Sequence, residues 1–296
     1  MARQDRATAS WTVRELLAWT TERFAALSSS PRLEAELLLA HGLGVDRLQL
    51  YLDFDKPLTA DELRTYRAAV RRRLAHEPVA YITGSREFWS RRFAVSPAVL
   101  VPRPETELLV EQAVGWLRGR LATTPRPVVL DVGTGSGAIA VAVALELPEA
   151  RVVAVDLSFA AVATARVNAA THGAPVRCLC GDLLAPFVAR PVFDLVLANL
   201  PYVVSGELAA LSPEVRDWEP RHALDGGVDG LQAIRALVGQ LGVRLRAGGQ
   251  VLLEVGAGQA PAVAELLRAS GLEGVTVWRD LAGIERVVGG SSIAAL

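Results

Sequence analysis

Three glycines at alternate positions, Gly133, Gly135 and Gly137, come shortly after an apolar stretch that ends at Asp131. Glycines in this spacing let the chain turn sharply and let a ligand lie against bare backbone. If a helix begins there, its first N–H groups and its dipole attract a polar or anionic ligand. The spacing differs from the G-x-G-x-x-G of dinucleotide-binding loops, and the Lys-Ser/Thr pair of a phosphate-binding loop is missing. The loop therefore predicts a nucleotide-like ligand without saying which one.

Two carboxylates follow this loop, each near the end of a later apolar stretch. Asp156 ends the stretch 151–156, and Asp182 stands in Gly-Asp-Leu after the stretch 176–180. The first can accept hydrogen bonds from both hydroxyls of a ribose, and the second can accept from an adenine amino group, with Leu183 beside the ring. Together with the acid-preceded glycine loop, this set resembles the S-adenosylmethionine site of class I methyltransferases. The predicted methyl-donor contacts are Gly133, Thr134, Gly135, Ser136, Gly137, Asp156, Asp182 and Leu183.

A second motif, Asn199-Leu200-Pro201-Tyr202, follows the apolar stretch 193–198. Its simplest interpretation is a tight turn closed by proline. It also suits methyl transfer to a planar nitrogen: the Asn199 side-chain oxygen and the Leu200 carbonyl can accept from its two N–H bonds, and Tyr202 can stack on the flat group. Pro201 stiffens such a turn. We therefore predict Asn199 to Tyr202 as catalytic and substrate-binding residues, with Asn199 also beside the donor.

The chemistry asked of this turn is mainly alignment. A sulfonium methyl is already activated, so no strong base is needed before transfer and the proton can leave afterwards. Alignment is worth roughly 7–11 kcal/mol at best. The same geometry serves adenine N6, cytosine N4 and a glutamine side-chain amide, so the motif alone leaves all three acceptors open.

Both motifs need a scaffold that brings strand ends together. After residue 125, strands expected at 128–131, 151–156, 176–180, 193–198 and 249–254 alternate with helices expected at about 137–147, up to 172, 230–245 and 260–269. This alternation predicts a mostly parallel, Rossmann-like α/β sheet that is covered on both faces and binds ligands at its carboxyl edge. Two late strands, near 274–278 and 286–288, predict an antiparallel edge hairpin because little chain separates them.

The first part of the chain has helical patterns instead. Capping boxes begin at Thr12 and Thr59, Ser30-Pro31 is typical of a helix start, and Gly42 and Gly44 are typical of a helix end. These signals predict a small helical bundle. The segment 79–104 is rich in aromatic residues and has strand composition at 93–96 and 99–101, before a helix expected from Glu105.

Composition narrows the class of protein. Of 296 residues, 51% are apolar and 21% charged, which is a globular composition. No apolar run reaches the ~18–20 residues that span a bilayer, and the first ten residues lack the apolar core of a secretory signal, so we expect a cytoplasmic protein. The net charge of −1 argues against a broad nucleic-acid surface. Two cysteines one residue apart cannot build a four-ligand zinc site, and no metal is expected.

Several further segments carry a more specific resemblance. They are Tyr81-Ile-Thr-Gly84, Glu87-Phe-Trp89, Phe93-Ala-Val-Ser-Pro97, Leu100-Val-Pro-Arg-Pro-Glu-Thr-Glu107, Arg216-Asp-Trp-Glu-Pro220, Ala223-Leu-Asp-Gly226, Asp280-Leu-Ala-Gly283 and Arg286-Val-Val. With the two motifs above, these segments resemble the protein-(glutamine-N5) methyltransferases that modify peptide chain release factors, the PrmC/HemK family. The similarity extends from about residue 81 to 288, and the helical N-terminal region also fits.

The resemblance implies a domain plan and a reaction. It implies a helical docking domain (1–78), a β-hairpin linker (79–104) and a class I methyltransferase domain (105–296). The implied substrate is the glutamine of the Gly-Gly-Gln loop of class 1 release factors, whose amide Asn199 to Tyr202 would grip. S-adenosylmethionine would be the donor and S-adenosylhomocysteine the product, and direct contact with nucleic acid or a membrane is not expected.

One departure keeps other functions open. The family usually has proline where this chain has Leu200, and Asn-Leu-Pro-Tyr is typical of rRNA adenine dimethyltransferases. An adenine-N6 methyltransferase acting on rRNA or DNA is therefore the alternative, although those enzymes place their helical domain after the catalytic one. A non-catalytic donor-binding module is a further possibility. Leu200 keeps the backbone carbonyl that the chemistry needs, so we expect the glutamine reaction to survive.

Three smaller features have two interpretations each. The segment Pro102–Glu107 is either a stiff helix entry or, by resemblance, a wall of the donor pocket. Trp218-Glu-Pro220 lies in a long loop, for which we hypothesise a lid over the acceptor. Arg71–Arg73 is either a solvated helix face or a docking surface for an RNA-bound or acidic partner. The four scattered histidines are expected to be structural or on the surface.

Overall fold

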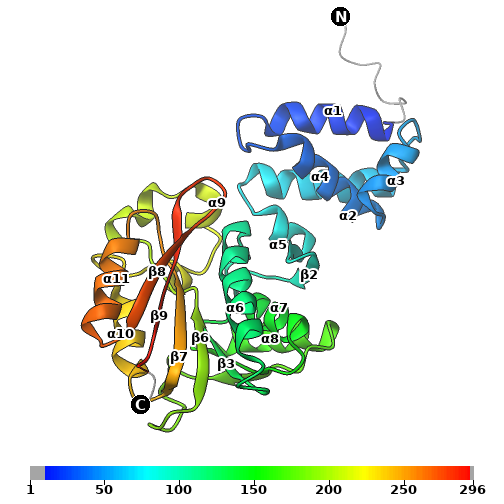
Figure 1. The fold of residues 1–296 in the computed structure, drawn as a ribbon. Coiled ribbons are helices and arrows are strands. Elements are labelled where there is room, and N and C mark those ends of the chain that lie inside the picture. The colour runs from blue at the N-terminus through cyan, green and yellow to red at the C-terminus, as the bar shows by residue number, and fades with distance from the viewer. Residues whose placement is uncertain (1–10, 294–296) are drawn as a thin grey trace, which may run out of the picture. The chain divides into compact units, whose positions relative to one another are not determined.

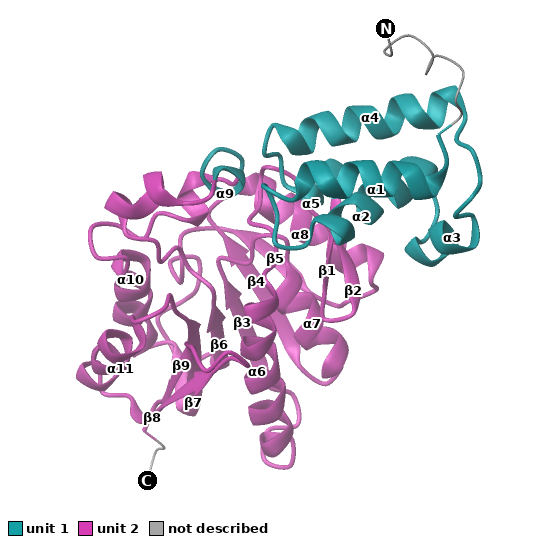
Figure 2. Cartoon of the chain, turned by 90° about the horizontal axis from the view of Figure 1, so that it is seen from above, with its two compact units in different colours: residues 1–84, 213–218 teal, residues 85–212, 219–296 magenta. Residues whose placement is uncertain are grey.

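The structure, a computed structural model, describes residues 11–293 and divides into two compact units (Figures 1 and 2). The first unit runs to Gly84 and also includes the later segment Pro213–Trp218. The second unit comprises Ser85–Ser212 and the chain from Glu219 onward. Within residues 11–293, none of the helices has both the length and the apolar character needed to cross a membrane.

The first unit is helical, as the capping patterns predict. Its helices are α1 (Val13–Phe24), α2 (Pro31–Leu43), α3 (Arg47–Leu52), α4 (Ala60–Leu74), α5 (Val79–Thr83) and α9 (Pro213–Arg216). The capping boxes at Thr12 and Thr59 both form. Of the two glycines expected to end α2, Gly42 lies within the helix, and the helix ends where Gly44 adopts a left-handed conformation. The helix start at Ser30 is confirmed in position only, because its side chain makes no capping hydrogen bond.

The arginine run on α4 is not a uniformly solvated face. Arg73 is 1% exposed and forms ion pairs with Glu34 (2.7 Å) and with Glu214 of α9 (2.8 Å). Arg72 pairs with Glu77. Two of the three guanidinium groups therefore form ion pairs inside this unit, and only Arg73 is buried, because Arg71 and Arg72 are both exposed.

The second unit is built on a seven-stranded sheet. Its strand order is β5-β4-β3-β6-β7-β9-β8, parallel as far as β7 and antiparallel on both sides of β9. The strands are β3 (Val128–Val132), β4 (Arg151–Asp156), β5 (Arg177–Cys180), β6 (Phe193–Ala198), β7 (Leu245–Glu254), β8 (Glu273–Arg279) and β9 (Glu285–Ser291). The predicted mostly parallel sheet with an antiparallel edge hairpin is confirmed.

Helices cover both faces of this sheet (Figure 1). One core cluster joins the sheet to α6 (Glu107–Arg120), α7 (Ala138–Glu146) and α8 (Phe159–Thr171), and the other joins it to α10 (Gln232–Leu241) and α11 (Ala260–Ala269). Strand residues alternate between the clusters: Val129 belongs to the first and Leu130 to the second. Burial on both faces explains why these strands are apolar throughout.

The segment before α6 differs from the sequence expectation. A two-stranded hairpin does form, from β1 (Ser85–Phe88) and β2 (Arg91–Ala94), but residues 79–83 are helical and the strand expected at 99–101 is absent. Prolines at 97 and 102 bracket that apolar stretch and remove backbone donors, so it cannot join a ladder. A short 3₁₀ helix, η1 (Pro104–Thr106), then leads into α6.

The long connection after β6 is ordered by short elements. It contains η2 (Ser205–Ala210), α9 and η3 (Arg221–Ala223) before α10 begins. Its middle part, Pro213–Trp218, belongs to the helical unit, whereas the parts on either side belong to the sheet unit (Figure 2). The chain therefore passes from one unit to the other and back within this loop.

Candidate active site

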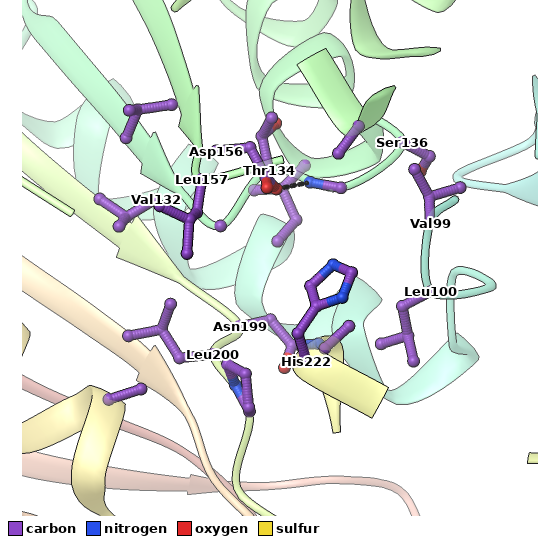
Figure 3. A pocket seen from close by; sticks show the side chains of 18 of the residues that line it. Val99, Leu100, Val132, Thr134, Ser136, Asp156, Leu157, Asn199, Leu200 and His222 are labelled. Carbon is purple, nitrogen blue, oxygen red and sulfur yellow. Dashed lines mark hydrogen bonds between the residues drawn. The ribbon is translucent and has the colours of Figure 1, made fainter. Parts of the chain in front are cut away.

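A cavity of about 420 Å³ opens at the carboxyl edge of the sheet, within the second unit. This size is in the usual range for small-molecule sites. Of the residues predicted to bind donor or acceptor, all except Gly137 and Tyr202 line it. Figure 3 shows Asp156 and Thr134 on one side of the cavity, and Asn199 and Leu200 on the other.

A buried carboxyl group holds the glycine loop in shape. Asp131 Oδ2 accepts from the Thr134 hydroxyl at 2.6 Å and from the Ala140 N–H at 3.2 Å. Complete burial raises the pKa of Asp131 to about 7. Gly137, another predicted donor residue, is the N-cap of α7 at a φ of 81°, and a Cβ there would stand 3.0 Å from that of Ala165. Glycine at 137 is thus explained by backbone conformation and packing.

Asp156 joins the ends of β3 and β4. Its two oxygens accept from the backbone N–H groups of Gly135 and Ser158, each at 2.8 Å. A carboxylate has about four lone-pair sites, so two remain for hydroxyl groups of a ligand. Bound in this way, the carboxylate presents a fixed acceptor pair to the cavity (Figure 3).

The loop after β5 contributes Asp182 and Leu183. Asp182 is exposed at the cavity, and Leu183 has an unusual positive φ of 46°. The next residue is held by α10, because the Leu184 N–H donates to the Gln240 side chain at 3.0 Å. This tie across 56 residues fixes a loop whose conformation the local sequence does not determine.

The glycine loop and the Asn199 turn touch each other. Strands β3 and β6 are parallel neighbours, with Val132 opposite Ala198, so Gly133 and Asn199 follow at equivalent positions. A Cβ built on Gly133 would lie 3.0 Å from Cδ2 of Leu200. Leu200 is 5% exposed and therefore packs on the glycine loop.

Two buried side chains behind Asn199 were not predicted as site residues. Asn199 Nδ2 donates to the hydroxyl of Thr106 in η1 at 3.1 Å. Glu254, the last residue of β7 and 2% exposed, receives hydrogen bonds from Thr106 and Asn199. Burial outweighs these hydrogen bonds and raises the pKa of Glu254 to about 7. Their sequence signals were weak: Thr106 lies in the segment considered as a pocket wall, and Glu254 is one acid at the end of an apolar strand.

Tyr202 lies beside the cavity lining and packs against the loop after β7. A Cβ on Gly256 would stand 3.1 Å from Cδ2 of Tyr202, and the Tyr202 carbonyl accepts from Gln259 Nε2 at 2.9 Å. Burial raises the pKa of the phenol to about 12, so the ring is neutral near pH 7. Stacking of this ring on an acceptor stays a prediction.

An ion pair joins the segment Pro102–Glu107 to the long loop after β6. Arg103, which lines the cavity, pairs at 2.6 Å with Glu219 of the long loop, whose side chain is 1% exposed. His222 is exposed, as expected of a surface histidine, and it also lines the cavity (Figure 3). Across residues 11–293, no His, Cys, Asp and Glu side chains come together as a metal site would require.

Comparison with known proteins matches two regions of the chain to families. Residues 15–84 match the PrmC N-terminal domain, and residues 129–218 match a methyltransferase domain. A solved structure, a Thermus thermophilus 16S rRNA N2 G1207 methyltransferase in complex with AdoMet and guanosine, has a TM-score of 0.50 at 21% identity. It covers 70% of this chain and 49% of that one. The fold and the methyltransferase-domain match define this chain as a Rossmann-like methyltransferase.

Curated relatives are closer and cover nearly the whole chain. A release factor glutamine methyltransferase from Geobacter sulfurreducens is 45% identical over 95% of this chain and 96% of its own length. One from Bordetella pertussis is 47% identical over 88% of this chain and 94% of its own. The chain belongs to the release factor glutamine methyltransferase family.

Proposed function

We propose that this chain transfers a methyl group from S-adenosylmethionine to the side-chain amide nitrogen of the glutamine in the Gly-Gly-Gln loop of class 1 release factors. The observation that carries the proposal is the direct contact between the glycine loop and the Asn199 turn in one cavity, in a chain of this family. The contact would set a donor held by the loop next to an amide held by the turn.

The donor side of the cavity fits an adenosyl group. Gly133, Thr134, Gly135 and Ser136 would lie against it, Asp156 would accept from the ribose hydroxyls, and Asp182 with Leu183 would hold the adenine. Asp156 retains free acceptor sites for this, and Asp182 is exposed to the cavity. When bound, S-adenosylmethionine supplies an electrophilic methyl group on a sulfonium.

The acceptor side would orient the amide. Asn199 Oδ1 and the Leu200 carbonyl would accept from the two N–H bonds of the glutamine nitrogen, Pro201 would stiffen the turn, and Tyr202 would contact the flat group. The glutamine nitrogen held by this turn would take the methyl group as the bond from sulfur to the methyl carbon breaks, and it would then lose one proton to water. Because neither step needs a strong base, alignment is the main contribution of the protein.

The same geometry would accept an adenine amino group. We therefore infer the acceptor from the relatives of this chain and not from the cavity alone. The relatives that match over most of this chain are named for release factors, and the domain matched at residues 15–84 is the N-terminal domain of that family. We infer that this helical unit helps to hold the release factor. A partner that works on the ribosome places the reaction in the cytoplasm.

The decisive experiment uses methyl-labelled S-adenosylmethionine with a purified class 1 release factor, its Gln→Ala loop variant, rRNA and DNA. We expect label on the release factor and none on the loop variant. Label on rRNA or DNA instead would establish the adenine alternative. Donor binding by calorimetry without any transfer would leave only a binding module.

A further inference from the structure

The amide of Asn199 has two possible orientations, and the proposed reaction needs one of them. The oxygen and the NH₂ group of a carboxamide have nearly the same size and shape, so the surrounding hydrogen-bond network decides which of them faces the cavity. Only the oxygen can accept from an N–H of the acceptor. With the NH₂ group turned to the cavity instead, Asn199 would oppose the acceptor nitrogen with its own donors.

We propose that Glu254 and Thr106 are positioning residues that fix the orientation of the Asn199 side chain, so that its oxygen faces the acceptor. The inference rests on the proposed function, because it assigns what holds the amide-binding group in place. It concerns three side chains from three different elements: β7, η1 and the turn after β6.

The three groups form a chain of hydrogen bonds with a defined direction. Asn199 Nδ2 donates to Thr106 Oγ1 at 3.1 Å. Glu254 accepts from both the Thr106 hydroxyl and the Asn199 amide, so the NH₂ group of Asn199 faces two acceptors on this side. An ionised carboxylate can only accept, so the Thr106 O–H must point toward Glu254. Its lone pairs then face Asn199, which must present its NH₂ group and leave its oxygen for the cavity.

Burial strengthens the control of these hydrogen bonds over the orientation of Asn199. Thr106 is 4% exposed and Glu254 is 2% exposed, so water does not compete freely for their hydrogen bonds. Among the described residues, no partner is found for Glu254 Oε2, which is the kind of buried polar atom that a purely structural role would avoid. A hydrophobic residue at the end of β7 would pack without this cost.

Protonation would release the constraint. A protonated carboxyl group both donates and accepts, so it could donate to Thr106 Oγ1, whose own O–H would then turn to the oxygen of Asn199. The pKa of Glu254, about 7, places this change near neutrality. The other charged groups that act on Glu254 are Arg286, which pairs with Asp280 at 3.0 Å, and Glu105; the Tyr202 phenol, with a pKa of about 12, stays neutral.

The experiment measures single-turnover methyl transfer to the release factor between about pH 6 and pH 9, with donor affinity measured by calorimetry. For the wild-type protein we expect an acid limb with a midpoint near pH 7. In Glu254→Gln the amide at position 254 both donates and accepts at every pH. The methyl-transfer rate of this variant should therefore be independent of pH and about tenfold lower than that of the wild type at alkaline pH, with donor affinity within about twofold of the wild type. Glu105→Gln, the control for the second carboxyl group, should keep the acid limb.

Two substitutions at Thr106 test the hydrogen bond between Thr106 and Asn199. They also provide a second test in case Glu254→Gln does not fold. Thr106→Val keeps the shape of the side chain and removes the hydroxyl, so it should lose about tenfold in rate, whereas Thr106→Ser should restore most of it. A Glu254→Gln protein that keeps both the wild-type rate and the acid limb would overturn the positioning role, as would equal rates for Val and Ser at 106. A wild-type protein that labels no release factor would instead overturn the proposed function itself, and this inference with it.

Discussion

The two sides of the cavity are built in different ways. On the donor side, the ties of the glycine loop are short in sequence: Thr134 to Asp131 spans 3 residues and Gly135 to Asp156 spans 21. The tie that holds the Asp182 loop, from Leu184 to Gln240, spans 56. On the acceptor side, they are long: Asn199 to Thr106 spans 93 residues and Arg103 to Glu219 spans 116. The glycine loop and Asp156 thus form a local strand–loop–helix unit, whereas the acceptor side is assembled from more distant segments.

This contrast suggests a division of function. A donor shared by many methyltransferases needs only a loop, a helix start and a carboxylate, which one stretch of chain can supply. An acceptor group with a specific orientation needs rigid side chains fixed by neighbours from several elements. We therefore expect substitutions on the donor side to change affinity or folding, and substitutions on the acceptor side to change turnover.

Asn199→Ala should have the largest effect. It removes the oxygen that would orient the amide, and loss of alignment costs at least about 10²-fold in turnover. The donor affinity, measured by calorimetry, should change by less than about threefold, because the glycine loop and Asp156 are untouched. A variant that keeps its turnover would show that the acceptor side is not where alignment is set.

Asp156→Ala should show the opposite pattern. It removes acceptors for the ribose and the partner of the Gly135 N–H, so the donor dissociation constant should rise about 10–100-fold. At saturating donor, the methyl-transfer rate should return to within a few-fold of wild type. If turnover stays low at saturation, the two sides are not separable in the way proposed.

Gly137→Ala tests whether this glycine is needed for folding rather than for the ligand. The positive φ of 81° and the 3.0 Å approach to Ala165 predict a loss of about 1–3 kcal/mol in the free energy of unfolding, measured with urea. The matched control is Gly239→Ala within α10, where a Cβ would meet nothing within 4 Å. That change should be neutral or stabilising by up to about 1 kcal/mol.

Asp131→Asn should give the smallest effect, seen only in the pH dependence of stability. The pKa of Asp131 is 3.8 ordinarily and about 7 in the folded protein, so the folded state keeps the proton to higher pH. The resulting stability is fully present below about pH 4 and is lost as the pH rises through about 7. Across this pH range the free energy of unfolding should fall less in the variant than in the wild type. The difference should be roughly 1 kcal/mol or more, measured by denaturant unfolding at each pH. Equal slopes would mean that Asp131 is already ionised.

Much of the fold could be predicted because its signals are local. The capping boxes at Thr12 and Thr59 and the apolar strand 193–198 reappear in the structure where the pattern placed them. The strand expected at 99–101 was wrong because its apolar side chains serve the cavity and the core, between two prolines that prevent pairing. Apolar composition reports burial, and burial is not restricted to strands.

The sequence by itself determined the sheet, the glycine turn and the carboxylate that ends β4, because strand period, backbone freedom and strand-end chemistry are properties of short segments. Only the tertiary structure decided that Leu200 packs on Gly133, that Arg73 is buried between two glutamates, and that Thr106 and Glu254 stand behind Asn199. These contacts join residues far apart in the chain, and the partner of a buried polar group depends on which strands become neighbours. No local pattern records that choice.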